Sequence, residues 1–238
     1  TAHIGVGGMG ASDLESIASH HSVQVVALCD VDEKSLNDAQ KKYPNAKAFK
    51  DYRTMFNEMS KNIDAVIVSI GGGGLISGVA SAIKQVNENC KIFGVEPKGA
   101  ATMLKSFSNG KPIKNVTIDS EVDSLSPPMT LPFSYAVCKK YIDEIVTVSD
   151  EEIFASMVIL QEESKLAVEP AAAATLSAYI GPLKHKLKNK NVGLLMCGAN
   201  IDHKSYSDLL KKGQNYICLL YTSDAADEGL GVDLGGRR

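Results

Sequence analysis

Two glycine-rich segments of the same kind constrain what this chain can fold into. The first is Gly5-Val6-Gly7-Gly8-Met9-Gly10, and the second is Ile70-Gly71-Gly72-Gly73-Gly74. Each segment stands between an apolar run and a helical pattern. Glycines in a strand-to-helix turn free backbone amides to converge on an anion at the helix N-terminus. We therefore expect two strand–loop–helix units, each with an anion cradle.

Apolar runs alternate with amphipathic helical patterns along most of the chain. Strands are predicted at residues 3–6, 23–29, 65–68, 91–95, 144–148 and 192–196. Helices are predicted at residues 12–19, 33–42, 51–60, 76–86, 101–107, 134–141, 150–166, 170–188 and 203–212. Strands separated by helices indicate a parallel sheet with helices on both faces, so the predicted fold class is α/β.

The first glycine segment has the layout that a dinucleotide requires. Gly5 allows the tight turn, Gly7 lets the backbone approach a pyrophosphate, and Gly10 lets the helix pack close to the strand. Asp30 ends the next apolar run, where its carboxylate could accept from ribose hydroxyls and would repel a 2′-phosphate. The pattern therefore favours NAD. The alternative is a plain glycine turn with Asp30 as a helix cap.

Residues 1–69 resemble a known family of oxidoreductases. The matching segments are Ile4 to Gly10, Val25 to Asp32, Asp51 to Arg53 and Ile63 to Ser69. They look like the NAD-binding, Rossmann-like domain of the glucose–fructose oxidoreductase/inositol dehydrogenase (Gfo/Idh/MocA) family. The family's Thr-Pro segment, its Glu-Lys-Pro motif with the catalytic lysine, and its substrate domain do not occur here. The resemblance thus implies an NAD half-site without hydride transfer.

The second glycine segment is not needed by the third strand of a dinucleotide-binding domain. Four consecutive glycines can turn several amides toward one phosphate, and the following helix adds the partial positive charge of its N-terminus. The alternative is a flexible linker between two domains. A linker, however, has no reason to lead directly into a periodic helix.

Residues 64–212 resemble a second family, the pyridoxal-phosphate-dependent threonine/serine dehydratases and serine racemase (fold type II). The motifs that carry the resemblance are the segments 71–78, 93–97, 143–148, 165–170 and 197–202. The segment from Pro127 to Pro132 resembles the threonine dehydratase branch. The resemblance implies a fragment of an ammonia-lyase that acts on threonine or serine as small-molecule substrate.

The resemblance also implies roles for individual residues. Gly71, Gly72, Gly73 and Gly74 match the loop that binds the cofactor phosphate. Cys197 matches the residue that faces the pyridine nitrogen, and Glu169 matches an acid near the cofactor ring. Read without the resemblance, Cys197 is a small core residue, and Glu169 before a proline is a helix cap.

A divalent-cation site of some family members maps onto the segment after residue 95. Glu96 and the carbonyl of Ala100 match two of its ligands. The third ligand in the family is an acid, and this chain has Thr102 there. We therefore do not expect a metal ion to bind.

The lysine that joins the cofactor in this family is missing. It lies in the N-terminal half, in a Ser-Phe-Lys-like motif that no lysine of this chain matches. Without a Schiff-base lysine, elimination is not expected. Three hypotheses follow: a catalytically incomplete dehydratase fragment, an NAD-dependent oxidoreductase fragment, and an assembly chimera of both without a cellular role.

The domain boundaries follow from the two resemblances. We expect a dinucleotide-binding fragment at 1–69, the C-terminal half of a dehydratase at 70–213 and a disordered tail at 214–238. The tail resembles translated read-through of a sequencing adapter, and the first residue, Thr1, suggests a fragment. A strand common to both families at residues 64–68 leaves open one continuous sheet or two separate half-domains.

Composition excludes several partners. The net charge of −3 gives no attraction to nucleic acid or an anionic membrane, and no apolar run is long enough to span a bilayer. The five cysteines are scattered and without CxxC pairs, which favours free thiols in a reducing cytoplasm over disulfides or zinc. The oligomeric state stays open.

Overall fold

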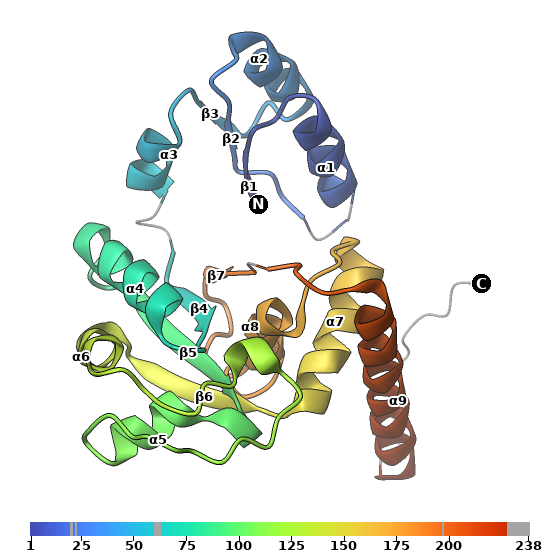
Figure 1. Ribbon diagram of the computed structural model, residues 1–238. Helices are drawn as coiled ribbons and strands as arrows, with labels where there is room; N and C mark the ends of the chain where they lie inside the picture. Colours follow the sequence, from blue (N-terminus) through green and yellow to red (C-terminus); the bar gives the residue numbers. More distant parts are fainter. Residues whose placement is uncertain (20, 22, 60–62, 197, 228–238) are drawn as a thin grey trace. The chain divides into compact units, whose positions relative to one another are not determined.

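The computed structural model describes residues 1–19, 21, 23–59, 63–196 and 198–227 (Figure 1). The chain divides into two compact units. The first unit comprises Thr1–Ile63 with Gln85–Glu88, and the second comprises Asp64–Lys84 and the described residues from Asn89 onward. Each unit has its own sheet, all strands of both sheets are parallel, and helices flank them. The α/β prediction is confirmed.

The first unit is a three-stranded sheet with the order β1-β2-β3. Its elements are β1 (Ala2–Ile4), α1 (Met9–Ala18), β2 (Ala27–Cys29), α2 (Glu33–Lys42), β3 (Lys47–Phe49) and α3 (Tyr52–Met59). Side chains alternate across the central strand β2. Leu28 packs with Leu14 and Leu36 of α1 and α2, while Cys29 packs with Met55 of α3, so both faces of the sheet are covered.

The third strand of this sheet is not the one that the sequence predicts. Residues 65–68 are indeed a strand, β4 (Ala65–Ser69), but it pairs with β5 and β7 in the second unit. All five residues of β4 are buried, which suits the interior of the larger sheet. The edge strand next to β2 is instead the short segment Lys47–Phe49. It begins with an exposed lysine and does not read as an apolar run.

The second unit is built on a four-stranded sheet with the order β6-β5-β4-β7. Its strands are β4, β5 (Lys91–Pro97), β6 (Glu144–Val148) and β7 (Val192–Leu194). Its α-helices are α4 (Gly74–Val86), α5 (Thr102–Ser108), α6 (Pro132–Tyr141), α7 (Asp150–Ser164), α8 (Pro170–Ile180) and α9 (His203–Asp227). Two short 3-10 turns, Lys98–Ala100 and Asp123–Leu125, complete it.

Helices cover both faces of the second sheet (Figure 1). On one face the alanine-rich helix α8 packs against β4, β5 and β6, and its small side chains form a core with Phe93 and Val95. Gly94 points to the opposite face, where a Cβ would lie 2.3 Å from Ile70 and 3.3 Å from Ile76 of α4. Close packing on both faces explains why β4 and β5 are almost entirely buried.

Helix α7 is capped at its N-terminus by Ser149. The Ser149 hydroxyl accepts from the amide of Glu152, and the Glu152 carboxylate accepts from the amide of Ser149. This reciprocal capping box stabilises a helix by about 1 kcal/mol. The helix ends at Lys165, which has a left-handed backbone with φ 56°.

Helix α9 is longer than expected. It runs to Asp227. Residues 214–227 are therefore helical, although a disordered tail was expected from residue 214. Gly213 allows α9 to cross α7 closely, because a Cβ there would lie 2.2 Å from the carbonyl oxygen of Phe154. Residues 228–238, the rest of that tail, lie outside the described residues. No described helix is long and apolar enough to cross a membrane.

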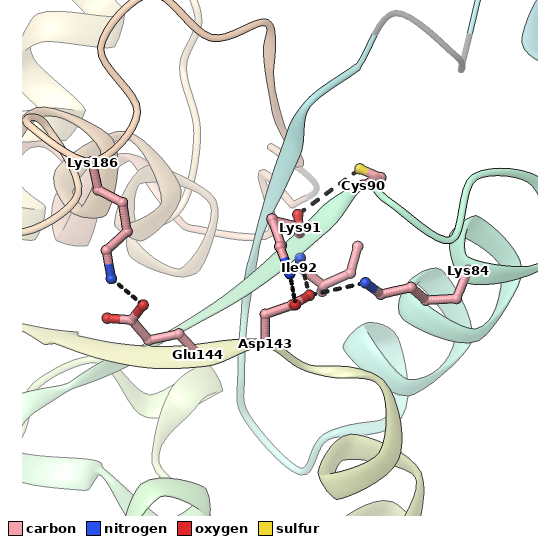
Figure 2. A network of polar contacts seen from close by, with 7 residues as sticks. All are labelled: Lys84, Cys90, Lys91, Ile92, Asp143, Glu144 and Lys186. Carbon is pink, nitrogen blue, oxygen red and sulfur yellow. Dashed lines mark hydrogen bonds and ion pairs between the residues drawn. The ribbon is translucent and has the colours of Figure 1, made fainter.

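A cluster of ion pairs lies at the amino-terminal edge of the second sheet, and Asp143 is at the centre of the cluster (Figure 2). One carboxylate oxygen of Asp143 accepts from Lys84 of α4 at 3.0 Å and from the amide of Ile92 at 2.9 Å. The other accepts from Lys91 at 2.8 Å. Beside it, Lys186 pairs with Glu144. Asp143 thus ties the end of α4 to the start of β5 and β6.

Candidate functional site

The second glycine segment lies at the carboxyl end of β4, between the flanking strands β5 and β7. Ligands of open parallel sheets bind at this edge of the sheet, because helix N-termini and loop amides face it. The structure therefore places Gly71, Gly72, Gly73 and Gly74 where an anion cradle is expected.

Two of the four glycines are required by the protein itself. Gly73 has φ +85°, a conformation that side chains rarely adopt. Gly71 passes so close to the loop at residue 124 that a Cβ would lie 2.6 Å from the carbonyl oxygen of Ser124. At Gly72 and Gly74 a Cβ would meet no protein atom within 4 Å. These two positions leave open space in front of the loop, as a bound group would need.

The amides of this loop are available to a ligand. Within the described chain, the amides of residues 71–76 donate to no backbone carbonyl, and the first intrahelical bond of α4 runs from Ser77 to Gly73 at 3.0 Å. The first turn of α4 carries no acidic residue, so nothing opposes the partial positive charge of its N-terminus. Free amides, open space and a helix N-terminus together fit a phosphate group.

Glu169 lies at the start of α8 and contacts the segment that follows β7. Its amide donates to the carbonyl of Gly198 at 3.1 Å. A Cβ on Gly198, whose φ is +126°, would lie 2.2 Å from the Glu169 carboxylate. Although Glu169 occupies the N-cap position of α8, its side chain makes no capping hydrogen bond. The half-buried carboxylate therefore does not cap the helix.

A cavity of about 750 Å³ is lined by Ser124, Glu169 and Asn200, among other residues. Gly71 contacts Ser124, so the glycine loop adjoins this cavity. Ser124 could not be predicted as a site residue, because it lies in a stretch without periodicity. Asn200 belongs to a motif quoted for the resemblance, without a role of its own. Cys197 lies outside the described residues, so its role stays a prediction.

Glu96 lies in the interior of the second unit and accepts hydrogen bonds from backbone amides. It is fully buried, and its two carboxylate oxygens accept from the amides of Met103 and Leu104, each at 2.8 Å. The Thr102 hydroxyl donates to the carbonyl of Pro127 at 2.9 Å. Burial raises the pKa of Glu96 to about 7, although the amides that it accepts from act in the opposite direction. Glu96 thus holds the first turn of α5.

The described residues contain no group of three His, Cys, Asp or Glu side chains that could hold a metal ion. For Glu96 and Ala100, which match two cation ligands of the family, the expectation that no metal ion binds stays a prediction. Ala100 itself is buried in a 3-10 turn between β5 and α5.

The first glycine loop has the backbone that the sequence predicts. Gly5 has φ +76°, and a Cβ on Gly10 would lie 1.8 Å from the carbonyl oxygen of Gly5, so the helix packs directly on the turn. A Cβ on Gly7 would lie 2.4 Å from the hydroxyl of Ser35. Ser35 is a neighbour of this loop that no local sequence pattern indicates.

Asp30 binds the first loop and is not a helix cap. One carboxylate oxygen accepts from the amide of Val6 at 2.8 Å, and the other accepts from the amide of Asp32 at 2.9 Å. The cap of α2 is Asp32, which accepts from the amides of Lys34 and Ser35. The capping alternative for Asp30 is therefore wrong. Asp30 joins the end of β2 to the glycine loop.

Comparison with known proteins connects most of the chain to one family. The model of the family "Pyridoxal-phosphate dependent enzyme" matches residues 34–198. The chain is 42% identical over 174 residues to phenylserine dehydratase of Ralstonia pickettii, covering 69% of this chain and 53% of that enzyme. It is 33% identical over 181 residues to the chloroplastic threonine dehydratase 2 of Solanum lycopersicum, covering 74% and 30%.

Solved structures give the same result. The processed form of threonine deaminase isoform 2 from Solanum lycopersicum superposes with a TM-score of 0.62 at 30% identity, covering 74% of this chain and 55% of that one. Maize serine racemase superposes with a TM-score of 0.58 at 28% identity, covering 76% and 61%. The chain spans about half the length of most of these relatives. The family match begins at residue 34, inside the segment that resembles an oxidoreductase.

Proposed function

The chain belongs to the family of pyridoxal-phosphate-dependent enzymes, and we propose that it is the phosphate-binding half of a threonine/serine dehydratase, an ammonia-lyase. The observation that carries the proposal is the cradle of free amides at residues 71–76, with open space in front of Gly72 and Gly74 at the N-terminus of α4. The names of the relatives, among them phenylserine and threonine dehydratases, support a β-hydroxy amino acid as the substrate class.

The residues of this chain fit the cofactor. The amides of the glycine loop and the N-terminus of α4 would hold the phosphate, and Glu169 and Cys197 would lie near the ring. Pyridoxal phosphate, when bound, withdraws electrons from the α-carbon of an amino acid and so eases removal of its α-proton. A neutral thiol at Cys197 would leave the pyridine nitrogen largely unprotonated, which suits elimination of a β-hydroxyl.

By itself, this chain is proposed to lack lyase activity, because no lysine matches the motif of the family's cofactor-bonding lysine. Lys212 is the lysine that lines the cavity beside Glu169. It pairs with Glu121 at 2.5 Å and therefore has a partner already. Incubation with pyridoxal phosphate, reduction with borohydride and peptide mapping should find no specifically modified lysine. Stoichiometric labelling of Lys212, with ammonia release from threonine, would overturn this.

The phosphate cradle is tested by a substitution that places a side chain in its open space. Gly72→Asp should place a carboxylate in the open space of the loop and weaken binding of pyridoxal phosphate more than tenfold, because like charges repel at short range. The matched control is Gly78→Asp in the following helix α4, where a Cβ also meets no atom within 4 Å. Equal affinity of Gly72→Asp and the unmodified chain, by fluorescence titration, would refute the phosphate cradle.

The geometry of the first loop supports a second candidate, an NAD half-site from an oxidoreductase. Gly5 and Gly10 have the turn and the close helix packing that a pyrophosphate site requires. NAD should raise the melting temperature, and NADP should not, because Asp30 repels a 2′-phosphate. Asp30→Asn, which keeps one acceptor for the loop amides, should abolish the selectivity. No shift at millimolar NAD counts against the site.

A third proposal is that the chain is an assembly chimera without a cellular role, because its two glycine loops resemble two different families. It predicts that no single uninterrupted genomic read crosses residues 63–74. A read that spans this segment would remove it.

A further inference from the structure

The back of the Gly73 turn is packed by two helices that do not contribute to the amide cradle. A Cβ on Gly73 would lie 2.8 Å from Cε of Met103 in α5 and 3.1 Å from Cβ of Ser134 in α6. It would also lie 3.5 Å from the sulfur of Cys138 in α6. The turn therefore has a fixed wall behind it, opposite to the open space at Gly72 and Gly74.

One carbonyl in this turn receives two donors. The Gly73 carbonyl accepts from the amide of Ser77 at 3.0 Å and from the thiol of Cys138 at 3.9 Å. The Ser77 hydroxyl lies 3.4 Å from the same sulfur. Cys138 is fully buried and Ser77 is 7% exposed. The buried thiol of Cys138 thus reaches a peptide group of the glycine loop, and the Ser77 hydroxyl contacts that thiol.

That peptide group decides where the next amide points. A trans peptide is planar, with its carbonyl and its N–H on opposite sides. Because the Gly73 carbonyl is fixed toward α6 and the helix interior, the amide of Gly74 must point away from them, toward the cradle. A neutral thiol is needed here, since a thiolate would repel a phosphate. Burial raises the pKa of Cys138, which keeps the thiol protonated.

We propose that Cys138, together with Ser77, is a positioning residue that holds the Gly73–Gly74 peptide in its phosphate-binding orientation. The inference rests on the proposed function and deepens it: affinity for the phosphate depends on α6, which supplies no amide to the cradle. Neither residue contacts the ligand. Their effect is confined to the phosphate group and does not extend to the pyridine ring.

The test compares three probes: inorganic phosphate, pyridoxal phosphate and pyridoxal, which has no phosphate. Cys138→Ala should weaken both phosphate-bearing probes about five- to tenfold, the effect of one lost hydrogen bond, and leave pyridoxal unchanged. Cys138→Ser keeps a donor and should restore affinity to within about twofold. The matched control is Cys90→Ala, a buried thiol at the opposite edge of the sheet, whose sulfur lies 3.9 Å from the carbonyl of Lys91.

A ligand-independent measurement accompanies the titrations. In a sample labelled with 15N-glycine, Cys138→Ala should shift the amide resonance of Gly74, and Cys90→Ala should not. Ser77→Ala removes the neighbouring hydroxyl without emptying the packed position of the thiol, and it should give a smaller loss of the same kind. This second variant keeps the test valid if Cys138→Ala unfolds.

The outcomes separate the two proposals. If the unmodified chain binds phosphate and Cys138→Ala and Ser77→Ala bind it equally well, the positioning role is refuted while the cradle stands. If the losses extend equally to pyridoxal, the role is general packing, and the inference is again refuted. If the unmodified chain binds neither phosphate nor pyridoxal phosphate, the cradle is refuted, and the positioning role with it.

Discussion

At the scale of single residues, Glu96 makes the stability of the second unit depend on pH. Burial raises the pKa of its carboxyl from 4.5 to about 7. The folded protein therefore keeps this proton at pH values where the unfolded chain has lost it. The stabilisation is complete below pH 4.5 and is lost as the pH rises through about 7. At about 1.4 kcal/mol per pKa unit, we expect a loss of a few kcal/mol, measured by urea unfolding at pH 5 and pH 8.

The variant Glu96→Gln isolates this contribution. Its amide cannot ionise, so the difference in unfolding free energy between the two pH values should become smaller than in the unmodified chain. Glu151→Gln, at an exposed position of α7, should leave the pH dependence unchanged. If the unmodified chain and Glu96→Gln show the same pH dependence, Glu96 does not titrate in this range.

Glu96 also shows the limit of what sequence reveals about a site. The sequence and its family resemblance place an acid after a buried strand, but they do not say which way its carboxylate turns. In this structure the Glu96 carboxylate accepts hydrogen bonds from the amides of Met103 and Leu104. Gly73 is the opposite case, because its positive φ follows from the pattern of the loop. Residues of a local backbone pattern were predictable, whereas contacts between distant segments, such as Gly71 with Ser124, were not.

At the scale of elements, Asp143 fixes helix α4 relative to the sheet. Burial opposes the ionisation of Asp143, but hydrogen bonds from Lys91, Ile92 and Lys84 outweigh it and lower the pKa. Asp143→Ala should lower the unfolding free energy by about 2–3 kcal/mol, because two lysines and one amide lose a partly buried partner. The measurement is urea unfolding at pH 7.

The matched control for this change is an exposed ion pair. Asp208 pairs with Lys211 at 3.5 Å one turn along α9, and half of its side chain is exposed. Asp208→Ala should cost less than about 0.5 kcal/mol, as exposed pairs contribute little. Equal effects of the two variants would show that Asp143 is also only a surface charge.

Most helices and strands were predictable because their apolar residues repeat with the period of the element. The helix Glu33–Lys42 and the strand Glu144–Val148 begin and end where the sequence predicts. Periodicity, however, identifies a strand without its partner, which is why the sequence left open which sheet residues 64–68 join. The three-residue strand β3 is too short to show a period. The end of α9 lacks an apolar stripe that would indicate a helix.

At the scale of the whole molecule, the two compact units have separate cores. Leu28 is fully buried in the first, among Leu14, Leu36 and their neighbours, and Ile67 is fully buried in the second. Leu28→Ala should destabilise the first unit by about 2–5 kcal/mol, the usual cost of such a cavity. Hydrogen exchange read by mass spectrometry should accelerate in peptides of the first unit, and affinity for inorganic phosphate should be unchanged.

The reciprocal variant, Ile67→Ala, removes a side chain of β4, the strand that leads into the glycine loop. It should accelerate exchange in the second unit and weaken phosphate binding, since the loop depends on the strand before it. If Leu28→Ala accelerated exchange in α7 and α8 as strongly as in α1 and α2, the chain would unfold as one cooperative body. The anion cradle would then depend on the first unit, and the phosphate-binding half could not be assigned to the second unit alone.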